Sequence, residues 1–175
     1  HFGISVASAG DVNADGFDDV VVGADLAAGA AGAAYLFLGG AGPSFNSAAD
    51  RTLPGSVIAD HFGFSVSSAG DVNGDGFDDL VVGAYSGGTE GSASVYFGGP
   101  GTFNTTVDGA LTGAANIDNF GRSVSRAGDV NGDGFDDVLV GATGNDGAGT
   151  GAGAAYVYLG GPGTTFNAVA DSVLT

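Results

Sequence analysis

The chain has 175 residues, of which 43% are hydrophobic and 13% are charged, so it can build a core and is not a charge-rich disordered segment. Twenty acidic residues stand against three basic ones, and the resulting net charge of −17 excludes nucleic acids and anionic membrane surfaces as partners. No apolar run approaches the roughly 18 residues that membrane insertion needs, and without cysteine there are no disulfide bonds.

Three copies of one motif account for the sequence. They open at His1-Phe2-Gly3, His61-Phe62-Gly63 and Asn119-Phe120-Gly121, so successive copies are spaced by 60 and 58 residues. Each copy continues through an Asp-rich stretch, a Val-rich run that ends in Gly-Ala, and an apolar, aromatic-containing run that ends in Gly-Gly. Periods of this length are typical of arrays of one supersecondary unit. The predicted units are residues 1–60, 61–118 and 119–175.

Four short strands are predicted in each copy, here given for the first. Residues 3–9 alternate apolar and small polar side chains, the period of a half-buried strand. Residues 19–24 contain a continuous valine run, which suits a strand covered on both faces, and residues 33–38 form a third strand. Residues 49–53 are polar and weakly patterned, as an outer edge strand can be. No segment has a sustained helical pattern, so very little helix is expected.

A four-stranded antiparallel meander repeated at this length predicts an all-β fold made of three β-propeller blades. A sandwich or a parallel β-helix is the alternative. A sandwich does not predict near-identical copies, and the coils of a β-helix are shorter than these repeats.

The acidic loop between the first two strands of each copy carries the candidate chemistry. In the first copy it runs from Asp11 to Asp19, with oxygen-bearing side chains at loop positions 1, 3, 5 and 9 and glycine at position 6. Such side chains converge on one ion when a loop coils around it, and the glycine permits the sharp turn. Hard oxygen donors without histidine or cysteine favour Ca²⁺ over zinc or copper, and a flexible cage of six or seven oxygens suits Ca²⁺ better than Mg²⁺.

Three loops in register favour metal binding over the alternative that Asp, Asn and Gly merely form turns. Position 7 is expected to add its main-chain carbonyl while its ring anchors the loop in the core. The predicted Ca²⁺ ligands are Asp11, Asn13, Asp15, Phe17 and Asp19; Asp71, Asn73, Asp75, Phe77 and Asp79; and Asp129, Asn131, Asp133, Phe135 and Asp137.

These loops are not EF-hands, because valine occupies position 12, where an EF-hand has its bidentate glutamate. Position 9 is therefore expected to supply the closing carboxylate. The aspartates at position 8 are interpreted as solvated charges, and they are Asp18, Asp78 and Asp136.

The Phe-Gly opening, the Asp-x-Asn-x-Asp-Gly-Phe-Asp-Asp loop and the later Gly-Ala resemble FG-GAP repeats, the blades of integrin α-subunit propellers and of many bacterial surface proteins. The resemblance covers essentially the whole chain. It implies one four-stranded blade per repeat and one Ca²⁺ in each acidic loop. It also implies an extracellular or cell-surface role in adhesion, interaction or assembly, without catalysis. The chain departs from the family in having three repeats where such propellers usually have seven.

Two other functions stay open at this point. One is a lectin-like carbohydrate binder, for which Tyr35, Tyr96, Tyr156 and Tyr158 are candidate sugar platforms, although packing between blades is the preferred interpretation. The other is a calcium-dependent polysaccharide lyase, which needs a general base in a chain that has no lysine and only five histidines and arginines together. Taking the adhesion and carbohydrate hypotheses together, the expected partner is a protein or glycan surface ligand.

Assembly is the last expectation from the sequence. Propellers close with about four to eight blades, so three blades form an arc with apolar faces at both ends. We expect the ring to be completed by further repeats of a longer chain or by a second copy in a homo-oligomer. The sequence begins without methionine or a signal-peptide pattern, which predicts a processed or internal segment.

Overall fold

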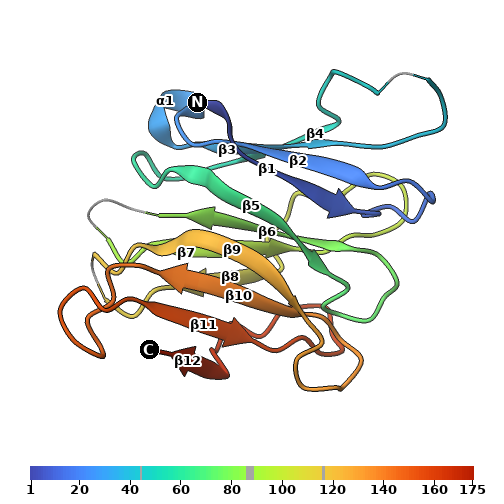
Figure 1. Cartoon of the computed structure of the whole chain (residues 1–175). Coiled ribbons are helices and arrows are strands. Elements are labelled where there is room, and N and C mark those ends of the chain that lie inside the picture. The colour runs from blue at the N-terminus through green and yellow to red at the C-terminus, as the bar shows by residue number, and fades with distance from the viewer. Residues whose placement is uncertain (44, 86–88, 116) are drawn as a thin grey trace.

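Three four-stranded antiparallel sheets form the architecture of the chain (Figure 1), as the sequence predicts for propeller blades. The computed structural model describes residues 1–43, 45–85, 89–115 and 117–175. Blade 1 consists of β1 (Phe2–Gly10), β2 (Asp19–Ala24), β3 (Ala33–Phe37) and β4 (Arg51–Pro54). Blade 2 consists of β5 (Phe62–Gly70), β6 (Asp79–Ala84), β7 (Ser92–Tyr96) and β8 (Gly109–Thr112). Blade 3 consists of β9 (Phe120–Gly128), β10 (Asp137–Ala142), β11 (Ala154–Tyr158) and β12 (Ser172–Leu174).

Each blade is a simple meander in which consecutive strands pair. The valine run of β2 lies between β1 and β3, with Val22 opposite Val6 on one side and Tyr35 on the other. Val21 is fully buried and Val22 is 8% exposed, which accounts for the apolar character of the run. The outer strand β4 pairs only with β3. The predicted units 1–60, 61–118 and 119–175 stay a prediction, with their boundaries in the segments before β5 and β9.

Helix is nearly absent from the described residues, in agreement with the sequence pattern. The single short element α1 (Ala27–Ala30) contains left-handed backbone at Ala28 and Gly29, so it is a turn between β2 and β3 rather than a regular helix. Within the described part of the chain, no helix has the length and apolar character required to cross a bilayer.

An aspartate in each blade closes the long connection before the outer strand. The Asp50 carboxylate accepts a hydrogen bond from the Leu38 N–H at 2.9 Å, while the Asp50 N–H donates to the Leu36 carbonyl at 2.9 Å. The same carboxylate-to-backbone bond recurs at Asp108 and at Asp171. These bonds hold the Gly-Gly turn after the third strand in place, and the acidic loop depends on that turn.

The three blades stack in chain order, with blade 2 between the others (Figure 1). Strand β5 packs against β1 and β2, and β9 packs in the same way against β5 and β6. Two hydrophobic clusters fill the two spaces between blades, one including Leu36 and Tyr96 and the other including Val95 and Tyr158. The core therefore lies between the sheets, and the connecting loops lie along two opposite sides of the stack, where the strands end.

Candidate metal-binding loops

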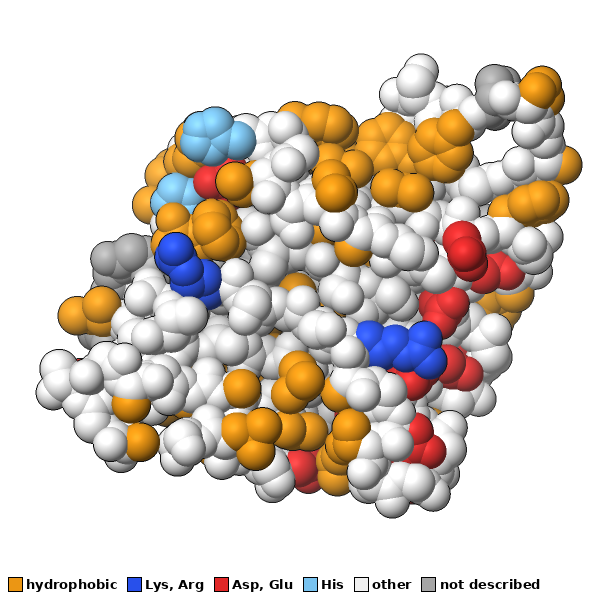
Figure 2. Space-filling model, viewed as in Figure 1, with side chains coloured by type: hydrophobic (Ala, Val, Ile, Leu, Met, Phe, Trp, Pro, Cys, Tyr) orange, Lys and Arg blue, Asp and Glu red, His pale blue; other side chains and the backbone are white. Residues whose placement is uncertain are grey.

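The three acidic loops lie along one side of the stack. They join β1 to β2, β5 to β6 and β9 to β10, and all three connections project toward the same side (Figure 1, right). Acidic side chains gather along this edge of the surface (Figure 2). The repeated meander produces this arrangement, because blades stacked in the same orientation have their equivalent turns on the same side of the stack.

The carboxylate at position 1 organises each loop. Asp11 accepts hydrogen bonds from the N–H groups of Asp15 at 3.0 Å and Gly16 at 2.8 Å, so the backbone coils around it. Asp71 and Asp129 accept the equivalent bonds and a further one from the N–H at position 4. In the third loop, the bond from the position-6 N–H is the main cause that lowers the pKa of Asp129.

Positions 3 and 5 lie side by side. Asn13 accepts a hydrogen bond from the Asp15 N–H at 2.9 Å and donates its side-chain amide to the Asp15 carboxylate at 3.1 Å. The second oxygen of Asp15 accepts from the Phe17 N–H at 3.0 Å. The same pattern recurs in the other two loops. The structure thus brings the donors at positions 1, 3 and 5 to one turn of chain.

The aspartate at position 9 has a different environment, because it is fully buried. Both oxygens of Asp79 accept backbone hydrogen bonds, one from the Val72 N–H and one from the Gly98 N–H, each at 2.8 Å. Asp19 and Asp137 are equally buried and make the equivalent pairs of bonds. Position 9 therefore joins the start of its own loop to the Gly-Gly turn after the third strand.

Burial makes the charged forms of Asp19 and Asp79 unfavourable. Desolvation is the largest effect and raises the pKa of Asp79 to about 8, although its two backbone hydrogen bonds act in the opposite direction. Burial also raises the pKa of Asp19, and the charges of Asp15 and Asp11 raise it further. In the first two loops the charges at positions 1 and 5 therefore repel the buried carboxylate at position 9.

The donor set fits a hard cation such as Ca²⁺, since it consists of oxygen atoms that carry several negative charges in one coiled loop. Among the described residues, no three acidic, histidine or cysteine side chains already form a compact metal cluster. The position-9 carboxylate is the member that stands apart, because both of its oxygens face backbone N–H groups.

The ring at position 7 does not anchor the loop in the core, so that expectation was wrong. Phe17 is 41% exposed, and Phe77 and Phe135 are only half-buried. The Phe135 ring lies instead against Gly74 of the preceding acidic loop, where a Cβ would collide with it. Among the described residues, the rings at position 7 belong to neither hydrophobic cluster between the blades.

Two of the three aspartates at position 8 are not solvated charges, which corrects the interpretation from sequence. Asp78 accepts a hydrogen bond from the Asp11 N–H of blade 1 at 2.9 Å, and Asp136 accepts one from the Asp71 N–H of blade 2 at 3.0 Å. Arg126 lies 2.7 Å from the Asp136 carboxylate. Asp18 is exposed, and the described residues donate no hydrogen bond to it. The recurrence of aspartate at a non-ligand position in all three copies was the available signal.

A three-bladed antiparallel stack with one acidic loop per blade defines a segment of a β-propeller. The sequence comparisons agree, because the FG-GAP repeat model matches residues 2–37, 62–97 and 120–158. The chain belongs to the FG-GAP repeat family. The resemblance inferred from the motifs is confirmed.

Integrin alpha subunits are among its relatives. The chain is 34% identical over 160 residues to integrin alpha-5 of Xenopus laevis, an alignment that covers 83% of this chain and 15% of that protein. It is 36% identical over 168 residues to integrin alpha-PS5 of Drosophila melanogaster, covering 90% of this chain and 16% of the relative. Human integrin alpha-IIb is 34% identical over 159 residues, covering 82% and 15%. The chain thus spans about 15% of the length of these relatives.

Proposed function

We propose that each acidic loop binds one Ca²⁺ through the oxygens at positions 1, 3, 5 and 9 and the carbonyl at position 7. The observation that carries this proposal is the convergence of Asp11, Asn13 and Asp15 in one coiled loop, where the charges of Asp11 and Asp15 also repel that of Asp19. A bound divalent cation supplies the positive charge that offsets this repulsion. The chain contributes the shape, because position 1 gathers the backbone amides and position 3 holds position 5 in place.

Calorimetric titration of the chain with CaCl₂ tests the proposal. We expect three sites, with affinities on the order of 10⁻⁴ to 10⁻³ M as in extracellular modules. Asp75→Asn should remove one site, because it takes a charged donor from the second loop. Asp18→Asn is the matched control and should retain all three sites, since position 8 is outside the donor set. Failure to bind millimolar Ca²⁺, or three unchanged sites in Asp75→Asn, would show that the ligand assignment is wrong.

The second part of the proposal is that the calcium-loaded segment acts outside the cell in adhesion or surface interaction, without catalysis. Support comes from the family and from relatives that are integrin alpha subunits. The recognition surface we propose is the side opposite the acidic loops, formed by the connections between the second and third strands of each blade. These connections differ in length among the blades, and loops that vary on a fixed scaffold commonly carry recognition. In blade 2 this connection includes residues 86–88, which lie outside the described residues.

The tyrosines favour a protein ligand over a glycan. Tyr96, Tyr156 and Tyr158 are buried in the clusters between blades, and Tyr35 is half-buried with its ring 5.5 Å from that of Phe2. Tyr96, Tyr156 and Tyr158 therefore pack between blades, whereas Tyr35 packs against Phe2 of its own blade, and these rings offer little free surface for a sugar.

Binding of the immobilised chain to extracellular-matrix proteins and to a glycan array, each with CaCl₂ and with chelator, separates these possibilities. We expect calcium-dependent retention of a protein and no glycan signal. A glycan signal alone would favour the lectin alternative. Incubation with acidic polysaccharides should give no unsaturated product, and formation of such a product would show that the chain is a lyase.

A further inference from the structure

An aromatic pair recurs in the first and third strands of two of the blades. In blade 3, the Phe120 ring of β9 packs against the Tyr156 ring of β11, with centroids 5.3 Å apart. In blade 1, the Phe2 ring of β1 packs against the Tyr35 ring of β3 at 5.5 Å. Both rings of the pair in blade 3 are buried, in the hydrophobic cluster between blades 2 and 3.

Blade 2 keeps the phenylalanine of this pair and lacks the tyrosine. Phe62 begins β5 and is 7% exposed, but the third residue of β7 is Ser94. The positions are equivalent, because Ser94 lies opposite the fourth residue of β6, as the two tyrosines lie opposite the fourth residues of β2 and β10. A small hydroxymethyl group thus stands where the other two blades have a phenol ring.

A cavity of about 210 Å³ lies at this position, between blades 1 and 2. Phe62, Ser94 and Tyr96 line it from blade 2, and Pro54 of β4 and Asp60 of the following connection line it from the side of blade 1. Phe62 and Tyr96 also belong to the hydrophobic cluster between these blades. A cavity of about 150 Å³ in a protein core suffices to bind benzene, so the cavity is large enough for a six-membered ring.

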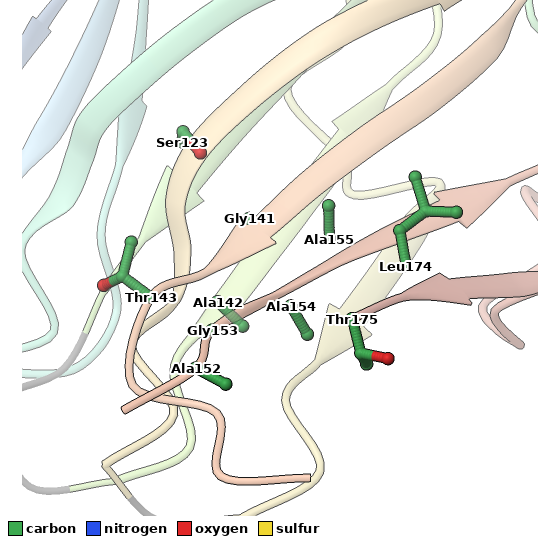
Figure 3. A pocket seen from close by; sticks show the side chains of 10 residues that line it. All are labelled: Ser123, Gly141, Ala142, Thr143, Ala152, Gly153, Ala154, Ala155, Leu174 and Thr175. Carbon is green, nitrogen blue, oxygen red and sulfur yellow. The ribbon is translucent and has the colours of Figure 1, made fainter. Parts of the chain in front are cut away.

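A wider groove on blade 3 differs from this cavity in its chemistry. It has a volume of about 600 Å³ and is lined by glycine, alanine and threonine residues together with Ser123 and Leu174 (Figure 3). Its lining contains no aromatic ring and no charged side chain, so it has little with which to orient a ligand. The cavity between blades 1 and 2 has both.

Asp60 gives the cavity a hydrogen-bond acceptor without a donor. Burial raises the pKa of the Asp60 carboxyl, and no described residue donates a hydrogen bond to it. Ser56 and Thr105 also line the cavity and are exposed, so a molecule can enter from solvent. A ligand that brings its own hydroxyl group would supply the donor that this carboxylate lacks.

The counterpart of Asp60 in the next connection is already linked to a phenol. Asp118 stands two residues before β9, as Asp60 stands before β5, and it accepts a hydrogen bond from the Asn145 side-chain amide at 3.0 Å. The same amide nitrogen donates to the Tyr156 hydroxyl at 3.1 Å. Between blades 2 and 3, aspartate and phenol therefore belong to one hydrogen-bonded group. Between blades 1 and 2, the aspartate and the phenylalanine are present and the phenol is missing.

We propose that the cavity between blades 1 and 2 binds a phenol ring, supplied by a small phenolic molecule or by a tyrosine side chain of another polypeptide. The ring takes the place that Tyr156 has in blade 3, beside Phe62 and Ser94, and its hydroxyl donates to the Asp60 carboxylate. The argument rests on the comparison of blades, since blade 2 keeps the phenylalanine and the aspartate that accompany Tyr156. It depends neither on calcium nor on the proposed adhesion function.

Titration of the ¹⁵N-labelled chain with 4-methylphenol, followed through its amide chemical shifts, tests the proposal. We expect saturable shifts centred on β7 and on residues 54–62, with a Kd on the order of 10⁻³ M or lower. Toluene, which has the same ring without the hydroxyl, should bind about fivefold more weakly or less. The absence of saturable shifts would mean that the cavity holds only water and would overturn the proposal, and equal affinities for the two compounds would overturn the part given to the hydroxyl.

A second compound separates the two sources of the ring. N-acetyl-tyrosinamide carries the phenol on a peptide-like backbone. If it produces the same shifts as 4-methylphenol, the cavity accepts a tyrosine of a polypeptide. If 4-methylphenol binds and N-acetyl-tyrosinamide does not, the ligand is a small phenolic molecule.

Filling the cavity from within the chain should exclude the ligand. Ser94→Tyr should abolish the binding of 4-methylphenol and raise the Tm, because the chain then supplies its own ring, as blade 3 does. Ser47→Tyr adds the same ring at an exposed position outside the cavity lining, so it should bind 4-methylphenol as the parent does. A folded Ser94→Tyr variant with the parent affinity would overturn the assigned site.

A milder variant keeps the proposal testable if Ser94→Tyr does not fold. Asp60→Asn removes a charge that accepts no hydrogen bond from the described residues, so the variant should keep the circular dichroism of the parent. Its affinity for 4-methylphenol should fall about five- to tenfold, the difference between a charged and a neutral acceptor, while its affinity for toluene stays the same. An unchanged affinity for 4-methylphenol would overturn the contact with Asp60.

Discussion

Replacement of Asp79 by alanine separates the two functions that the structure gives to position 9 of the acidic loop. The Asp79 carboxylate is fully buried and accepts hydrogen bonds from the Val72 and Gly98 N–H groups at 2.8 Å. These bonds join the loop to the neighbouring turn without any metal. Asp79→Ala should therefore destabilise the fold even when Ca²⁺ is removed by a chelator.

The size of the loss follows from the two bonds. A hydrogen bond to a charged group contributes about 1.5–3 kcal/mol, so the pair contributes about 3–6 kcal/mol. Burial raises the pKa of Asp79 to about 8, so the carboxyl is mostly protonated at pH 7 in chelator. Its two hydrogen bonds then approach the neutral range of about 0.5–1.5 kcal/mol each, and the lowest value of about 3 kcal/mol applies to the pair. We expect a loss of about 3 kcal/mol in the free energy of unfolding. For a chain of this length that corresponds to a fall of about 6–12 °C in Tm.

Urea unfolding in chelator, followed by circular dichroism, measures this loss directly. The control is Asp75→Ala at position 5, which removes a predicted Ca²⁺ ligand that is exposed. Its stability in chelator should lie close to the parent value, and its deficit should emerge when CaCl₂ is added. If Asp79→Ala is as stable as the parent in chelator, or if the two variants lose the same amount there, the structural function assigned to position 9 is wrong.

Three further results are expected. Adding Ca²⁺ at about 100 times its Kd should stabilise the native state by about 2.7 kcal/mol per independent site, and a Tm that is the same in CaCl₂ and in chelator would contradict this. Gly23→Ala should cost about 1–3 kcal/mol or more because its methyl group overlaps the Gly63 carbonyl of the next blade. Gly141→Ala meets the Ser123 side chain of its own blade, which can rotate, so it should cost less; equal urea midpoints would count against this contact between blades. Burial raises the pKa of Tyr96 and Tyr158 to about 12 from 10.0, so stability present below pH 10 should be lost as pH rises toward 12; circular dichroism that stays unchanged up to pH 12 would contradict this.

The strands and loops were predictable because their causes are local. Alternation in β1, the valine run of β2 and the glycines of the acidic loop each act within a few residues, and threefold repetition reinforced each signal. The repeated aspartates at Asp50, Asp108 and Asp171 were visible in the sequence, but their bonds to the third strand required the structure.

The contacts between blades could not be predicted in the same way. Asp78 bonds to a backbone N–H that lies 67 residues earlier in the chain, and no local pattern encodes such a partner. Position 7 failed for a related reason. A phenylalanine in an apolar-rich repeat favours burial, but the neighbouring blade decides what its ring contacts, as the contact of Phe135 with Gly74 of the preceding loop shows. Residues that act between repeats are thus hidden from an analysis of each repeat alone.

The order of the stack has a consequence for cooperativity. Blade 2 packs against both blade 1 and blade 3, while each of these packs against blade 2 alone within the described residues. In these 175 residues taken alone, opening blade 2 therefore breaks two interfaces, whereas opening blade 1 or blade 3 breaks one, so thermal fluctuations begin in blades 1 and 3. The free energy of opening that protects a backbone amide from hydrogen exchange then depends on the repeat in which the amide lies, even at positions where the three repeats have the same residue. Equivalent amides in repeats of similar sequence should therefore exchange at different rates, because the repeats differ in their packing against neighbouring blades.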